Sequence, residues 1–404
     1  MSEIDPFHLQ IVSKYLTTIN DFISLEIVCK KYKGNMEKFH NNPIPVDKKT
    51  IKYFPNIETL NLWSKTDERF GNDIYNNKKD AQNKVDFFQI SVWFEVEYNT
   101  VRSSKDSNIR FHNVTYAQKN RKRFGNKIPD CVTKLGEECF SKDGNFKIHT
   151  VTLPPHLKEI GGRCFYDQSL ESIDLPPSLT KIDGDYCFYQ CFNLTSIKLP
   201  DSLSVLGNYC FIACSNLKSV TMPSHLKRIG YYCFEYCYSL QSIEVPDCDE
   251  LDVYAFEKCK SLTSASLGGS FSKIEDNVFA KCSSLVSINF PTSILAFGAF
   301  CFTGCQMESI VLPSNLKEVS CGCFYQCSSL KSVILPTTVS SIGEYAFSEC
   351  VNLKTLLLPS SVKELKEQCF DGCTQLDIIV PSTVTFIEEK CFQNCKSVVY
   401  QHVE

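Results

Sequence analysis

A phenylalanine that recurs at a nearly fixed interval constrains the fold of this chain more than any other feature. Neighbouring repeat phenylalanines are 22 to 25 residues apart. Repetition at this period is typical of a solenoid, in which each repeat forms one coil and buries its apolar face by stacking on the next coil. The repeat phenylalanines are Phe140, Phe165, Phe188, Phe211, Phe234, Phe256, Phe279, Phe302, Phe324, Phe347, Phe370 and Phe392.

Each repeat combines two apolar spacings, as the repeat that contains Phe211 shows. Ile197 and Leu199 alternate with polar residues, which predicts a strand, and Pro200 then ends the strand pairing. The apolar residues from Leu203 to Cys214 are three or four positions apart, which predicts tight turns or a helical turn. We therefore predict that one coil contains one main strand and its return segment.

The cysteines follow the same period. Of the 23 cysteines, ten lie three residues after a repeat phenylalanine and nine lie immediately before one. At the second of these positions the other repeats carry Ala255, Val278 and Ala346, so the position accepts small apolar side chains. A buried, reduced thiol behaves in this way.

The positions of the histidines and the spacing of the cysteines disfavour a catalytic or metal-binding role for the thiols. The seven histidines do not recur in register with the cysteines, as a cysteine nucleophile would need. The spacing of Cys187 and Cys191 differs from the usual Cys-x-x-Cys of zinc sites. We therefore expect no enzyme activity, no metal and no cofactor. A disulfide between such cysteines is within reach, so the reduced state depends on a reducing compartment.

Net charge and hydropathy indicate no particular ligand and no membrane-spanning segment. The formal net charge of -4 is too small to indicate a nucleic-acid partner. Met1 is not followed by the basic stretch and apolar run of a secretory signal. The sequence also contains no stretch of about 18 apolar residues, the length that is needed to span a bilayer. We expect a cytoplasmic protein without a transmembrane segment.

Residues 126–404 resemble the BspA-like class of leucine-rich repeats. The resemblance rests on the phrase Leu194-x-x-Ile197-x-Leu199-Pro200, followed by Leu203, Leu206-Gly207 and Cys210-Phe211-x-x-Cys214, which returns twelve times with variations. It implies a parallel β-sheet solenoid that serves adhesion or protein binding and has no catalytic residues of its own. The implied alternative to a cytoplasmic scaffold is a cell-surface or secreted adhesion protein that is exported without a recognisable signal peptide.

The outward strand positions are the candidate contact surface of this solenoid. Side chains alternate across a strand, so the position before the last inward residue faces solvent. This position is polar in the early repeats and aliphatic in the last four, at Val311, Ile334, Leu357 and Ile379. Adjacent exposed aliphatic residues mark a protein-binding surface. The alternatives are that self-association, a bent array or the tail Lys396 to Glu404 covers them.

Residues 1–45 form a predicted helical head. The stretch from Pro6 to Tyr32 resembles an F-box, although Asp5 replaces the usual leucine and Tyr32 the usual tryptophan. The resemblance implies docking on the small adaptor of a cullin-type ubiquitin ligase, with the solenoid as substrate receptor. The alternative is a cap over the first coil, because solenoid ends need covering. The residues implied in docking are Pro6, Leu9, Val12, Leu16, Leu25, Val28 and Cys29.

Residues 46–125 form a predicted irregular linker or divergent repeat region. Within it we expect one strand in Pro55 to Leu62 and another over Ile90 to Val96. The basic run from Lys119 to Arg123 is either a solvated face or a nuclear-import patch. The identity of the partner and the oligomeric state stay open.

Overall fold

The computed structural model describes residues 6–28, 30–75, 84–104, 106–269 and 271–401. The chain folds into two compact units: the first holds Met1–Tyr116 with Pro129–Lys134, and the second holds Ala117–Ile128 with Leu135–Glu404. Among the described residues, the helices are all too short or too polar to cross a membrane.

The first unit begins with a helical head that has its own aromatic core. Its helices are α1 (Pro6–Ser13) and α2 (Ile19–Val28). Phe22 of α2 is fully buried. Its ring packs edge-on against Phe39 and Phe54, with centroid distances of 5.8 and 5.4 Å. The Phe22 side chain is therefore part of the core of this unit and is not accessible to a partner.

The rest of the first unit contains divergent coils. The strands pair in parallel and in register, so that Leu60, Ile90 and Ile109 lie side by side. Strands are therefore present in both segments where the sequence predicted them. The elements are β1 (Thr59–Leu62), β2 (Gln89–Val92), β3 (Val96–Glu97), α3 (Tyr98–Ser103), β4 (Ile109–Phe111) and β5 (Val114–Tyr116).

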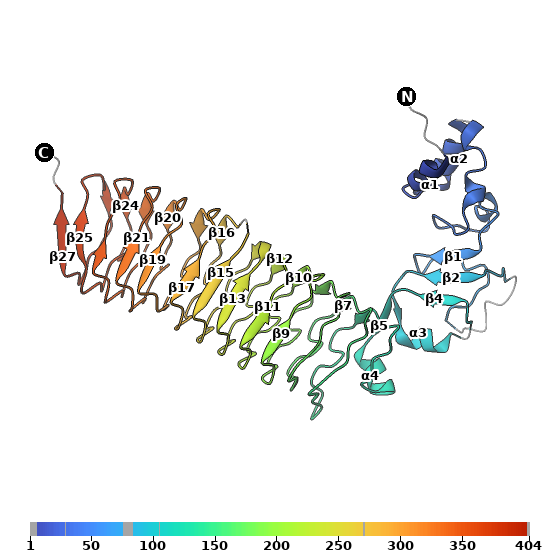
Figure 1. Ribbon diagram of the computed structural model, residues 1–404, viewed down its shortest axis with the longest axis horizontal. Helices are drawn as coiled ribbons and strands as arrows, with labels where there is room; N and C mark the ends of the chain where they lie inside the picture. Colours follow the sequence, from blue (N-terminus) through green and yellow to red (C-terminus); the bar gives the residue numbers. More distant parts are fainter. Residues whose placement is uncertain (1–5, 29, 76–83, 105, 270, 402–404) are drawn as a thin grey trace. The chain divides into compact units, whose positions relative to one another are not determined.

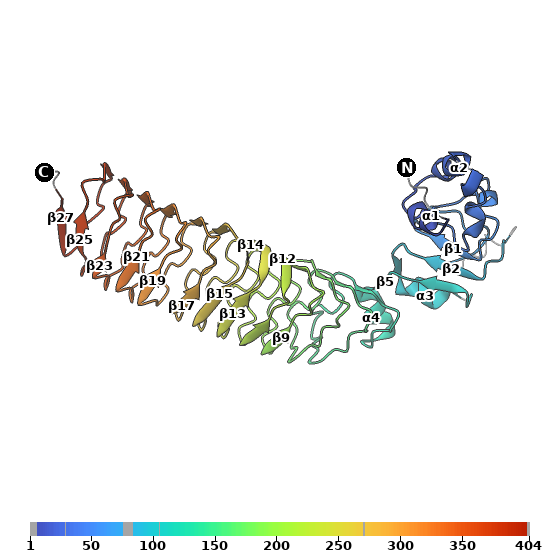
Figure 2. The same ribbon diagram turned by 45° about the horizontal axis from the view of Figure 1, so that its top comes forward.

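The second unit is a parallel β-solenoid, which confirms the predicted fold class. From Ser196 onward its coils carry a main strand and a short return strand, whereas the coils before Ser196 carry return strands alone (Figures 1 and 2). Strands of each kind pair in parallel with their own kind, and each of the two series is divided into three sheets. The main strands are β9 (Ser196–Lys198), β11 (Ser219–Thr221), β13 (Ser242–Val245), β15 (Ser264–Leu267), β17 (Ser287–Asn289), β19 (Ser309–Val311), β21 (Ser332–Ile334), β23 (Thr355–Leu356), β25 (Asp377–Val380) and β27 (Ser397–Tyr400). The return strands are β6 (Lys134–Leu135), β7 (Glu159–Ile160), β8 (Lys181–Ile182), β10 (Val205–Leu206), β12 (His225–Ile229), β14 (Asp247–Leu251), β16 (Lys273–Ile274), β18 (Ala296–Phe297), β20 (Glu318–Val319), β22 (Ser341–Ile342), β24 (Glu364–Leu365) and β26 (Phe386–Ile387).

The third side of each coil is a tight turn around the repeat phenylalanine, and we call this side the turn face. The stretch from Leu203 to Cys214 contains β10 and turns, without the helical turn that was one of its two predicted forms. Turns of adjacent coils are joined by backbone hydrogen bonds, such as the 2.8 Å bond from the Phe211 amide to the Cys233 carbonyl. The phenylalanine rings stack along the solenoid with centroids 5.0 to 5.8 Å apart.

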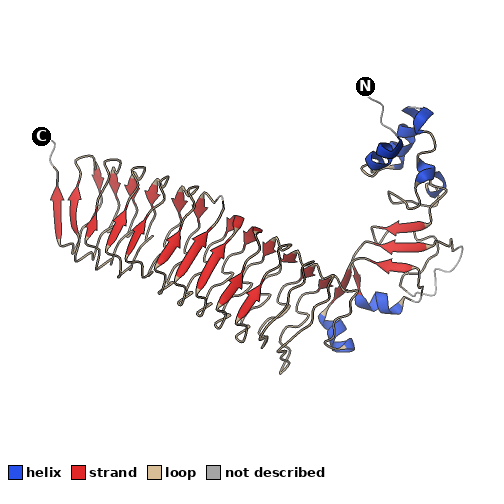
Figure 3. Ribbon diagram, viewed as in Figure 1, coloured by secondary structure: helices blue, strands red, loops and turns tan. Residues whose placement is uncertain are grey.

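Helix α4 (Gln118–Phe124) packs against the first coil of the second unit, and Figure 3 shows it as a short helix beside the strands. Arg121 is buried, its Nε donates a 2.7 Å hydrogen bond to the Cys139 carbonyl, and its guanidinium lies 4.0 Å from the centre of the Phe146 ring. Lys122 pairs with Asp143 at 2.6 Å. Arg121 is therefore not part of a solvated basic face, and α4 makes the contacts that a cap on this coil requires.

Candidate protein-binding surface

The main strands present one row of aliphatic side chains to solvent, which we call the aliphatic strip. The predicted members Val311, Ile334, Leu357 and Ile379 are 65%, 61%, 80% and 51% exposed. Strand pairing places Val311 beside Ile334. The alternate residues of the same strands point inward, as the predicted strand period requires.

Strand β27 adds a fifth member that sequence reasoning missed. Val399 is aligned with Ile379 in the β25–β27 pair and is 53% exposed. The described part of the predicted covering tail, residues 396–401, therefore extends the sheet instead of folding over the strip. The signal that could have found Val399 is the run Ser397-Val398-Val399-Tyr400, which has strand-forming residues but lacks the proline that follows most other main strands.

Ion pairs border the strip at the beginning of its strands. Lys331 contacts Glu308 at 2.8 Å, and Lys396 contacts Asp377 at 2.6 Å. All four side chains are more than half exposed, so the pairs add little to stability. The strip therefore combines apolar side chains with charged residues along one side.

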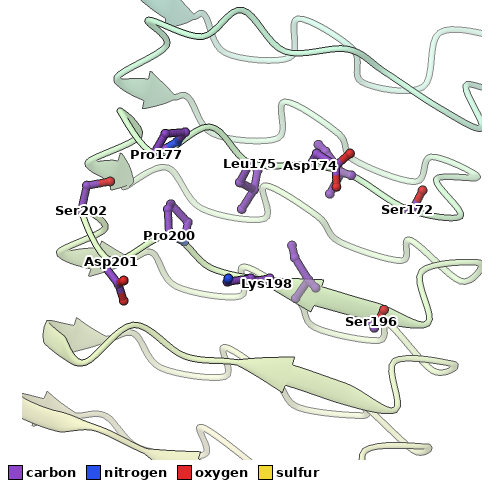
Figure 4. A pocket seen from close by; sticks show the side chains of 11 residues that line it. Ser172, Asp174, Leu175, Pro177, Ser196, Lys198, Pro200, Asp201 and Ser202 are labelled. Atoms are coloured by element: carbon purple, nitrogen blue, oxygen red, sulfur yellow. The ribbon is translucent and has the colours of Figure 1, made fainter.

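The same sheet surface is polar in the earlier coils and contains a shallow hollow of about 500 Å³ (Figure 4). Asp174 and Lys198 occupy the strip position in these coils, and Asp201 lies beside Lys198 along the chain. The hollow is lined by serine, proline, aliphatic and charged side chains, without an imidazole or a thiol.

The repeat cysteines are packed inside the coils. No described cysteine is in a disulfide, and the described residues contain no His, Cys, Asp and Glu cluster suited to a metal ion. The cysteine three residues after each phenylalanine donates its thiol to a phenylalanine carbonyl of the previous coil, as from Cys214 to Phe188 at 3.1 Å. Burial raises the pKa of Cys214 to about 12. These thiols are therefore neutral and bound to backbone.

One pair of thiols lies near the last coil. The Sγ atoms of Cys369 and Cys391 are 3.3 Å apart. Burial raises the pKa of Cys369 well above its usual value, whereas the hydrogen bond from Cys369 lowers the pKa of Cys391. The pair is held by packing and by a hydrogen bond from Cys391 to the Lys366 carbonyl at 3.0 Å.

The predicted docking residues of the head separate into buried and exposed groups. Leu9 is buried, Leu16 and Leu25 are half-buried, and Val12 and Val28 are exposed. The side chain of Pro6 is not described, and Cys29 lies outside the described residues. The structure adds exposed apolar residues that sequence reasoning missed. With Val12 and Val28 they form what we call the head surface: Ile11, Val12, Tyr15, Ile27 and Val28.

Comparison with solved structures returns proteins that are described as leucine-rich. A leucine-rich repeat protein from Bacteroides ovatus is 27% identical over 67% of this chain and 76% of its own, with a TM-score of 0.46. A leucine-rich repeat protein from Eubacterium ventriosum is 18% identical, covering 77% of this chain and 83% of its own, with a TM-score of 0.47. A leucine-rich cell surface protein from Faecalibacterium prausnitzii is 20% identical, covering 80% and 89%, with a TM-score of 0.41. No curated protein matches the chain.

The family model for the BspA type leucine-rich repeat region matches residues 113–184, 184–305 and 295–402. These matches cover the solenoid and do not reach the head, so the F-box resemblance gains no support from them. The matched residues include the recurring phenylalanines, the buried thiols and the parallel strands described above. The chain belongs to the BspA type leucine-rich repeat family.

Proposed function

We propose that the chain is a non-enzymatic protein-binding scaffold that holds its partner on the aliphatic strip. This proposal rests on the observation that Val311, Ile334, Ile379 and Val399 are more than half exposed on one side of one parallel sheet. Leu357, the residue that follows β23 of the same sheet, is 80% exposed at the matching repeat position. Single exposed apolar residues are ordinary, whereas a contiguous row on a rigid surface indicates a contact site. The sheet holds these side chains in place, so binding loses little backbone entropy.

The border of the strip fits a partner with an apolar centre and mixed charge around it. The ion pairs of Lys331 with Glu308 and Lys396 with Asp377 balance each other, and the exposed Lys354 adds one positive charge to the border. A single excess charge gives a strongly basic or acidic partner little electrostatic advantage. We therefore favour a folded protein with its own apolar patch over a nucleic acid.

Two substitutions in the strip test this proposal. Ile334→Glu with Leu357→Glu places two charges in the apolar centre, and we expect at least a roughly 100-fold loss of partner affinity. The matched control is Thr221→Glu with Asn289→Glu, because these exposed residues hold the same repeat position in earlier coils. Both variants should melt within a few degrees of the wild type.

The assay is differential capture followed by cross-linking. Proteins retained by the wild type and the control, but lost by the strip variant, are candidates, and their cross-links should include Lys331 or the exposed Lys354 near the strip. Partners that bind the strip variant normally would refute the proposal. A large drop in melting temperature of the strip variant would show that these side chains are covered in solution.

We propose a second docking surface on the head, for the adaptor of a cullin-type ubiquitin ligase. The supporting observation is the head surface, whose apolar side chains stay exposed although Leu9 and Phe22 are buried in the same unit. Exposed apolar side chains on or beside short helices are what adaptor docking needs. In this proposal the strip holds the substrate.

Point substitutions test adaptor docking better than deletion of residues 1–45, because deletion would remove both Phe22 and Phe39 and leave the buried Phe54 without these two ring contacts. Ile27→Glu with Val28→Glu should abolish binding to the purified adaptor. Ser24→Glu, on an exposed position of the same helix, should leave it intact. Failure of the wild type to bind the adaptor would end this proposal and leave the strip proposal untouched.

We propose further that the protein works in a reducing compartment such as the cytoplasm, with cell-surface adhesion as the alternative. Each thiol that donates to a carbonyl of the previous coil does so as a reduced group. Protein from its native source, denatured without reductant, should alkylate at most of its cysteines. Protection of many cysteines would favour export and the adhesion alternative.

A further inference from the structure

Half-buried tyrosines form two columns on the turn face of the second unit. In the first column, Tyr186, Tyr209, Tyr232 and Tyr254 precede the Cys-Phe or Ala-Phe pair of successive coils, and their rings stack with centroids 4.4, 5.2 and 4.6 Å apart. In the second column, Tyr166 and Tyr189 follow the phenylalanine, and their rings stack at 4.5 Å. The Tyr186 and Tyr189 rings meet edge-on at 5.6 Å, which joins the columns.

Both columns stop near the first coil, where one ring position is not filled. The backbone pairs Lys142 with Tyr166 through a 3.0 Å hydrogen bond, so Ser141 is the residue that precedes Tyr166 in the second column. A serine is too small to cover the ring face that Tyr166 turns away from Tyr189. A hollow of about 560 Å³ lies at this point, lined by Glu138, Ser141, Lys142, Arg163, Tyr166, Tyr186 and Tyr189.

The charged groups around this hollow leave one excess positive charge. Arg163 lies 3.6 Å from Glu138, and both side chains are about half exposed. Asp167 is paired with two lysines, Lys142 at 2.6 Å and Lys147 at 2.7 Å. Three cations thus face two carboxylates. The Arg163 guanidinium also lies 5.7 Å from the centre of the Tyr186 ring, beside the hollow.

We propose that this hollow, the tyrosine hollow, binds one acidic sugar unit, a pyranose that carries a carboxylate. The face of a tyrosine ring has partial negative charge and attracts the C–H groups of a sugar ring that stacks on it. The sugar occupies the unfilled position beside Tyr166, and its carboxylate pairs with Arg163 and Lys142. The tyrosine hydroxyls, the Ser141 hydroxyl and the Glu138 carboxylate bind the sugar hydroxyls.

The mixture of groups favours an acidic sugar over other ring ligands. A flat aromatic acid would satisfy the cations and the ring face, yet its ring would offer no hydroxyl groups to the tyrosine and serine hydroxyls that line the hollow. A neutral sugar would leave the excess positive charge unused. The tyrosine hollow lies on the turn face, away from the aliphatic strip in sequence and in the coil, so this inference does not depend on the proposed protein-binding function.

Direct binding measurements on the full chain test the ligand class. Glucuronic acid, glucose and benzoate are titrated separately and followed by saturation-transfer NMR. We expect glucuronic acid to bind at least about tenfold more tightly than either of the others. Equal binding of glucose would overturn the role of Arg163 and Lys142. Tighter binding of benzoate would overturn the assignment to a sugar, and no binding of glucuronic acid would overturn the site.

Three variants test the location. Ser141→Tyr supplies the unfilled ring and should abolish glucuronic acid binding without lowering the melting temperature. Tyr166→Ala should weaken binding roughly tenfold. Tyr325→Ala is the matched control, because Tyr325 holds the same repeat position as Tyr166 but its ring meets Phe300 edge-on at 6.5 Å. The Tyr325→Ala variant should bind glucuronic acid as tightly as the wild type does. Wild-type affinity in both Ser141→Tyr and Tyr166→Ala would place the ligand elsewhere and overturn the proposal.

Discussion

Replacing one phenylalanine in the middle of the stacked column tests whether that column holds the solenoid together. Phe211 is fully buried, and its ring lies between Phe188 at 5.0 Å and Phe234 at 5.2 Å. Phe211→Ala removes both ring contacts and leaves a cavity between two coils. The hydrogen bond from the Cys237 thiol to the Phe211 carbonyl uses only backbone of that residue, so it should persist.

The expected loss of unfolding free energy is about 3–5 kcal/mol, the range for removing a buried phenylalanine ring. The upper end applies here, because rings pack on both faces and each aromatic pair adds about 0.5–1.5 kcal/mol. Phe392 is the matched comparison, since it is half-buried, stacks on Phe370 at 5.8 Å and has on its other side only an edge-on contact with Tyr400 at 6.5 Å. Phe392→Ala should cost about half as much.

Denaturant unfolding followed by circular dichroism measures the loss, and hydrogen exchange locates it. The amides of Phe188 and Phe211, which donate to the Cys210 and Cys233 carbonyls, should lose protection in Phe211→Ala before amides several coils away do. A cost below about 1 kcal/mol, or equal costs for Phe211→Ala and Phe392→Ala, would refute the view that the column stabilises the solenoid.

Three further predictions concern the thiols and α4. Raising the pH from 9 toward 12 should lower the free energy of unfolding. Burial raises the pKa of Cys214 to about 12, so in this range the unfolded chain releases a proton that the native state keeps. A denaturation midpoint that stays constant across this range would contradict the prediction. Native protein should be alkylated first at the exposed Cys131, whereas Cys210 should react only after denaturation, as peptide mass mapping would show. Arg121→Ala should cost roughly 1.5–3 kcal/mol and Lys122→Ala less than about 1 kcal/mol in urea unfolding, since only Arg121 is buried; equal costs would contradict the cap.

The aliphatic strip was partly predictable from sequence. The two-residue period of the strands placed Val311, Ile334, Leu357 and Ile379 outward, and they are exposed. Val399 was not found, because its coil departs from the repeat phrase and its alignment with Ile379 appears only when β27 pairs with β25. The course of tail residues 396–401 depended on the same pairing of β27 with β25, and no local sequence pattern specifies that pairing.

The sequence by itself determined the repeat, the parallel coil and the burial of most cysteines, because these follow from patterns that return in every coil. The tertiary structure decided features that depend on one particular neighbour. Arg121 is buried because α4 packs beside Cys139 and Phe146, although its basic run resembles a solvated face. The tyrosine hollow likewise exists because Ser141 precedes Tyr166 across two coils. Periodic patterns specify the coil, whereas such single contacts arise only after stacking brings distant residues together.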